Sequence, residues 1–97
     1  MASKKAAQES LMLSSVLDLN EASVLHGKLM ELRGRDLRID ASQVDRLGAQ
    51  CIQIIVAAAR TWQTDKKAFV VERASDAFEK TLQLIGLDPN QLTAKEN

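Results

Sequence analysis

Residues 49–62 constrain the fold more than any other part of this 97-residue chain. Cys51, Ile55, Ala58, Ala59 and Trp62 form one apolar stripe at helical spacing, and further isoleucines and a valine widen that stripe beyond a single seam. A helix with so wide an apolar surface is buried on more than one side. The elements that bury this helix must therefore come from the sequence before and after it.

The flanking sequence offers short apolar segments that are typical of strands. Residues 37–40 alternate apolar and polar side chains, which predicts a strand with at least one buried face. Residues 68–71 are almost continuously apolar, which suits an interior strand of a sheet. Residues 11–17 read as a further short strand or strand pair, broken by two serines.

Two more helices are predicted between and after these strands. Apolar residues recur at helical spacing over residues 22–32, and the stretch is preceded by Asp18-Leu19-Asn20, which offers a capping side chain, and followed by Gly34 as a stop. Ser75 caps the last helix, in which Phe78, Leu82 and Ile85 are expected to cover the sheet. The less favoured alternative is that Phe78 and its neighbours leave an apolar strip uncovered, as a second surface for a partner. Gly86 ends this helix.

Strands and helices thus alternate along the chain, which indicates an α/β fold with right-handed crossovers. We expect a single domain over residues 11–90, with a mixed sheet of about four strands packed against three to four helices. Residues 1–10 and 91–97 are polar or small and are expected to be flexible tails.

Composition excludes several function classes. The chain has 13 basic and 13 acidic residues, three aromatic residues and no tyrosine, so it lacks the basic stripe and the stacking surface of a nucleic-acid binder. Its longest apolar stretch, residues 54–59, is too short to span a membrane, and its first residues lack the apolar core of a secretory signal. We expect a cytoplasmic protein without a cofactor.

The residues that most often carry chemistry stand alone in this sequence. His26 has no carboxylate, cysteine or second histidine at ligand spacing, so a boundary or surface histidine is the simpler interpretation. Cys51 lies in the first turn of the apolar helix, where a thiol usually packs as a small hydrophobic group, with a reactive thiol as the less favoured alternative. Without a nucleophile, a base or a metal-binding set, we do not expect an enzyme.

Residues 37–55, LRIDASQVDRLGAQCIQII, resemble the central motif of STAS domains, the fold of anti-sigma factor antagonists. Asp40, Ser42, Val44 and Leu47 fall on the strand and turn positions of that motif. The resemblance implies a protein-binding domain. Family members that act as phosphorylation switches carry an acidic residue and then a serine at the start of the helix, where this chain has Gly48 and Ala49. The resemblance therefore implies a degenerate phosphorylation site, because alanine has no hydroxyl to accept a phosphoryl group.

Residues 46–62 are most similar to the small CheX/CheS-type STAS proteins of alphaproteobacterial chemotaxis operons, which also lack the serine. This resemblance implies an adaptor that binds a CheA-like histidine kinase and modulates phosphoryl signalling or dephosphorylation of a response regulator. Partner contacts are then expected at Asp45, Arg46, Gln50 and Gln53; the alternative for Asp45 and Arg46 is a local ion pair. A STAS subunit of a lipid-transport ABC complex and an anti-sigma factor antagonist remain as alternative functions.

Overall fold

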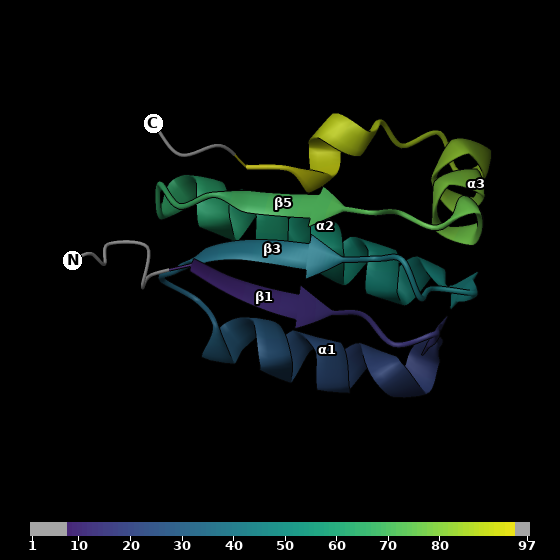
Figure 1. Cartoon of the computed structure of the whole chain (residues 1–97), viewed down its shortest axis with the longest axis horizontal. Helices are drawn as coiled ribbons and strands as arrows, with labels where there is room; N and C mark the ends of the chain where they lie inside the picture. Colours follow the sequence, from purple (N-terminus) through teal and green to yellow (C-terminus); the bar gives the residue numbers. More distant parts are fainter. Residues whose placement is uncertain (1–7, 95–97) are drawn as a thin grey trace.

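The computed structural model describes residues 8–94, which form three α-helices, five short strands and one 3-10 helix (Figure 1). In chain order these elements are β1 (Gln8–Met12), β2 (Val16–Leu17), α1 (Leu19–Glu31), β3 (Asp36–Asp40), β4 (Arg46–Leu47), α2 (Ala49–Thr64), β5 (Phe69–Glu72), α3 (Asp76–Leu84) and η2 (Pro89–Leu92).

The strands form two sheets. β1, β3 and β5 make a parallel sheet in that order, in which Leu11 lies opposite Ile39 and Ile39 lies opposite Val71. β2 and β4 make a separate parallel pair, which aligns Leu17 with Leu47. One antiparallel bridge, between Phe69 and Ala94, brings the C-terminal part of the chain alongside β5.

Both long helices lie on one face of the main sheet. The strand order β1-β3-β5 advances in one direction, so two right-handed crossovers place α1 and α2 on the same side. Figure 1 shows α2 behind β3 and β5, with α1 next to it beyond β1. Leu37, Ile39 and Phe69 face these helices and are buried, whereas Arg38 and Val70 alternate with them and are exposed on the other face.

The helix ends follow the predicted capping residues. The Asp18 carboxylate accepts a hydrogen bond from the Glu21 N–H, and the Ser75 hydroxyl oxygen accepts one from the Phe78 N–H. The Ser75 hydroxyl also donates to Val44 O at 2.6 Å, which ties the start of α3 to the loop before β4. Gly34 and Gly86 follow α1 and α3 with φ values of 93° and 77°, a conformation that glycine adopts without steric cost.

The hydrophobic core lies between the sheet and the two long helices. Trp62 is fully buried at the C-terminal end of α2, where its Nε1–H donates to Arg35 O at 2.6 Å. Its ring lies against Phe69 of β5, with 5.4 Å between the ring centroids. The wide apolar surface predicted for α2 is therefore used to contact the sheet on one side and α1 on another.

The α/β fold class is confirmed, but two details differ from expectation. Strand β1 begins at Gln8, and η2 with Ala94 continues past residue 90, so the ordered elements extend beyond residues 11–90 at both ends. Residues 1–7 and 95–97 lie outside the described residues. The prediction that Ile85 covers the sheet was wrong: Phe78 and Leu82 are buried, whereas Ile85 is the C-cap of α3 and remains 49% exposed.

Candidate partner-binding site

The candidate site is built where β4 passes into α2. Gly48 joins the two elements, and its N–H donates to Leu17 O at 2.8 Å, which holds the turn against β2. Its backbone has an ordinary extended conformation, with φ at −89° and ψ at 161°. A Cβ atom at this position would lie 3.2 Å from Leu17 O. Glycine is therefore favoured here by the close approach of two backbone segments.

The first turn of α2 lacks the side-chain cap that α1 and α3 possess. Gly48 supplies no side chain to accept from the free N–H groups of the helix, and the first turn carries no acidic residue. Ala49 follows directly and is exposed. The structure thus presents a methyl group on an open surface at residue 49. No phosphoryl acceptor is present at residue 49.

The structure exposes all four predicted contact residues. Asp45 and Arg46 are consecutive, and their N–H groups both donate to Ser15 O, at 2.7 and 3.0 Å, which holds this segment against the chain before β2. Gln50 and Gln53 follow on the outer surface of α2, one turn apart. Within residues 8–94, neither Asp45 nor Arg46 takes part in an ion pair, so the local pair considered from the sequence does not form.

Cys51 lies immediately beneath this surface and is fully buried. Its thiol contacts Asp18 O at 3.5 Å. Burial raises the pKa of the Cys51 thiol, and the carboxylates of Glu21 and Asp18 raise it further. Since the thiolate is the reactive form, these effects keep Cys51 protonated and favour the packing role over the reactive one.

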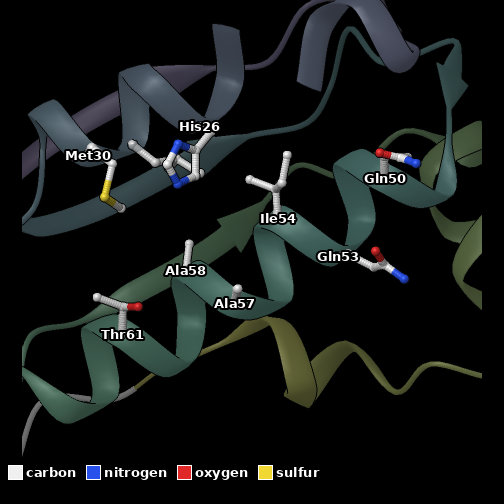
Figure 2. Close-up of a pocket in the computed structure, with 9 residues that line it drawn as sticks. His26, Met30, Gln50, Gln53, Ile54, Ala57, Ala58 and Thr61 are labelled. Carbon is white, nitrogen blue, oxygen red and sulfur yellow. The ribbon is translucent and has the colours of Figure 1, made fainter. Parts of the chain in front are cut away.

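A hollow of about 250 Å³ lies between α1 and α2, next to the predicted contact residues (Figure 2). In this view His26 and Met30 project from α1 toward α2, while Ile54 of α2 points back toward His26. Gln53 lies on the ridge of α2 and points away from α1. His26 is thus an exposed residue that lines this hollow, in agreement with the boundary or surface position predicted for it.

A larger groove, of about 530 Å³, lies on the other side of α2, between this helix and the segment that follows α3. Ile52 and Val56 contribute from α2, and Ile85 and Leu87 face them from the C-terminal segment. Sequence reasoning placed the possible apolar strip of the last helix at Phe78, which is buried, and missed this groove because it assigned Ile85 to the sheet. The place of Ile85 in the sequence could have indicated the groove. Ile85 immediately precedes Gly86, which ends the helix, so its side chain need not follow the buried face of α3.

The described residues contain no group of three or more histidine, cysteine, aspartate or glutamate side chains able to hold a metal ion. Among the same residues, no helix is both long and apolar enough to cross a membrane. The arrangement around Gly48 consists of an exposed helix start, neutral amides and one charge of each sign, which are groups suited to contacting another protein.

Comparison with known families agrees with this geometry. A family model described as "Mlab, STAS domain" matches residues 1–93. The chain belongs to the STAS domain family. STAS domains are in general non-catalytic modules that act through protein interactions, which fits the exposed start of α2. No curated protein matches this STAS chain.

Proposed function

We propose that this STAS domain is a non-catalytic adaptor of the CheX/CheS type, which binds a CheA-like histidine kinase in the cytoplasm and modulates phosphoryl signalling or dephosphorylation of a response regulator. The observation that carries the proposal is the exposed start of α2, where Ala49 lies between Arg46 and Gln50 and has no hydroxyl. The resemblance to STAS phosphorylation switches, which carry a serine at the start of this helix, implies that the switch is absent. The resemblance of residues 46–62 to chemotaxis STAS proteins supports the choice of partner.

A surface without a phosphorylation switch has one state, so its affinity for a partner does not change with phosphorylation at residue 49. Such a domain is suited to constitutive binding, with regulation supplied by the partner. Asp45, Arg46, Gln50 and Gln53 provide exposed hydrogen-bonding groups and one charge of each sign around Ala49. Arginine is frequent in the energetically important centre of protein interfaces, which makes Arg46 the first residue to change.

The test is titration calorimetry of the purified chain with the CheA-like kinase of the same organism. Arg46→Glu is expected to weaken binding at least tenfold. Arg38→Glu is the matched control, because Arg38 is also exposed but lies on the opposite face of the sheet. Circular dichroism of both variants checks the fold. Equal affinity of the Arg46 variant and the wild type would remove this residue from the site.

The second candidate is a STAS subunit of a lipid-transport ABC complex. The family model favours it, since the description of that model names Mlab. The same titration with the ATPase subunit of such a transporter separates the two candidates. Binding of the ATPase without binding of the kinase would move the function to lipid transport and leave the STAS fold unchanged.

A further inference from the structure

We propose that the larger groove beside α2 seats an amphipathic helix of the partner protein, with an acidic residue of that helix placed against Arg60. The kinase as the source of the helix rests on the proposed function, whereas the groove itself does not. The groove runs along α2 from Ala49 to Arg60 and is closed on its other side by Ile85 and Leu87.

The groove has an apolar floor and an apolar wall, in which Leu87 packs against the hydrophobic core and Ile85 does not. Ile52 is buried and Val56 is half-buried on α2, while Ile85 and Leu87 line the opposite side. Phe78 and Leu82 are the buried residues of α3, whereas Ile85 is 49% exposed. A contiguous apolar hollow with such a wall is typical of an interaction site, unlike a single exposed apolar side chain.

The length and lining of the groove favour a helix over a strand. Ala49 and Arg60 stand at its two ends on α2, and eleven residues of helix span about 16 Å, which is three turns of a second helix. A strand binds by adding its peptide groups to an open sheet edge. This groove is lined by α2 and the segment after α3 and contains no strand, so a segment that satisfies its own peptide groups fits better.

The charge of Arg60 indicates that the bound helix carries an acidic residue. Arg60 is exposed and is the one charged side chain among the residues that line the groove. It forms no ion pair within the described part of the chain. A carboxylate on the polar flank of the bound helix would meet this guanidinium, and arginine pairs with carboxylates through two parallel hydrogen bonds.

A second copy of this chain is a poor source for such a helix. The apolar stripe of α1 is buried through Ala22, Leu25 and Leu29, and that of α3 through Phe78 and Leu82. Since each of these helices already uses this stripe inside its own domain, neither can offer the stripe to a second copy without unfolding. The helix therefore comes from a different protein.

The groove also continues the candidate site. Ala49 and Gln53 belong both to the start of α2 and to the lining of the groove. A partner helix that enters beside Ala49 would run toward Arg60 while Asp45 and Arg46, at the start of β4, contact the body of the partner. One partner would then cover both surfaces.

Titration calorimetry with the full-length kinase tests the proposal. Arg60→Glu and Ile85→Arg are each expected to weaken binding at least tenfold, and Arg60→Gln is expected to lower the salt dependence of the affinity. Met30→Arg is the matched control, because Met30 is 39% exposed and lines the hollow on the other side of α2. We expect it to change the affinity less than twofold. Thermal unfolding of each variant verifies that the fold is intact.

The outcomes separate this inference from the proposed function. If the wild type binds the transporter ATPase instead of the kinase, the proposed function fails, and the same variants are titrated with the ATPase. Unchanged affinity of the Arg60 and Ile85 variants, or a larger loss of affinity in the Met30 variant, overturns the proposal that the groove seats a partner helix. Light scattering that shows a wild-type dimer dissociating on Ile85→Arg would assign the groove to a second copy and also overturn it. Binding to neither protein overturns both proposals.

Discussion

The two ends of α2 differ in how they are attached to the rest of the molecule. At the C-terminal end, Trp62 is fully buried and its indole N–H donates to Arg35 O, while the Asp65 carboxylate accepts from the Arg33 guanidinium at 2.9 Å. At the N-terminal end, Gly48 supplies no side-chain cap and Ala49 is exposed. The same helix is anchored at one end and open at the other.

The C-terminal end of α2 thus serves the stability of the fold, and the exposed side chains at its N-terminal end are available for recognition of a partner. The buried end supplies the packing that holds α2 against β5, and at the other end Cys51 and Ile52 are buried while Ala49, Gln50 and Gln53 are exposed. A partner can therefore be selected by these exposed side chains with little cost in folding. Changes at the two ends should accordingly differ in size and in kind.

The largest effect is expected from Trp62. Truncation by Trp62→Ala removes a fully buried ring and should cost about 3–5 kcal/mol of unfolding free energy. Trp62→Phe keeps most of the packing but leaves the Arg35 carbonyl without its donor, for a cost of about 1–3 kcal/mol. Urea unfolding measures both values. A loss below about 1 kcal/mol for Trp62→Ala would contradict the view that this end anchors the helix.

Gly48→Ala is expected to destabilise the chain by about 0.5–1 kcal/mol, because alanine is a poor N-cap and its Cβ would crowd Leu17 O. Gly27→Ala is the matched control. Gly27 lies inside α1, and a Cβ atom added there would have no heavy atom within 4 Å, so alanine should stabilise by about 0.5–1 kcal/mol. Thermal unfolding measures the change in stability of each variant. A loss for Gly48→Ala with a gain for Gly27→Ala would support the close approach at Gly48, and changes of the same sign would argue against it.

A smaller effect is expected from Arg33→Gln, which removes the ion pair at the anchored end. The hydrogen bond from Arg33 lowers the pKa of the Asp65 carboxyl below its usual range. The stabilisation is therefore complete above about pH 4, where the unfolded carboxyl is also ionised, and is lost as the pH falls through the lowered folded pKa. Unfolding at about pH 7 and about pH 2 should show a small difference from the wild type that is smaller at the lower pH. An equal difference at both pH values would assign the effect to packing of the Arg33 side chain.

The smallest change in stability is expected from Ala49→Ser, since residue 49 is exposed in the first turn of the helix. The unfolding midpoint should stay within error of the wild type. Mass spectrometry after incubation with an anti-sigma kinase and ATP then tests whether the restored hydroxyl accepts a phosphoryl group. The wild type should gain no mass in the same assay, and phosphorylation at another of its serines would contradict the single-state surface.

The sequence was sufficient for the fold where local signals agreed with burial. The alternation of residues 37–40, the caps at Asp18 and Ser75 and the stops at Gly34 and Gly86 all reappear in the structure. The extent of the ordered chain was harder to predict. Strand β1 begins at the polar Gln8 because β3 supplies its hydrogen-bond partners, and such pairing leaves no periodic mark in a short edge segment.

The candidate site was predictable in part. The exposed positions of Asp45, Arg46, Gln50 and Gln53 agree with helical spacing after a strand end. The larger groove was not predictable, because periodicity alone places Ile85 with Phe78 and Leu82. Only the actual end of α3 shows that Ile85 has left the helix and turned toward α2.

The antiparallel bridge at β5 has a consequence for assembly. Phe69 and Ala94 exchange two backbone hydrogen bonds of 2.8 Å each, so the C-terminal segment covers part of that edge of the sheet. β1 forms the opposite edge, and within residues 8–94 it pairs with β3 alone. Continuous edge-to-edge pairing of sheets from many copies requires two free edges on every copy. With one edge partly closed by its own chain, this domain is biased toward finite complexes and away from fibrils.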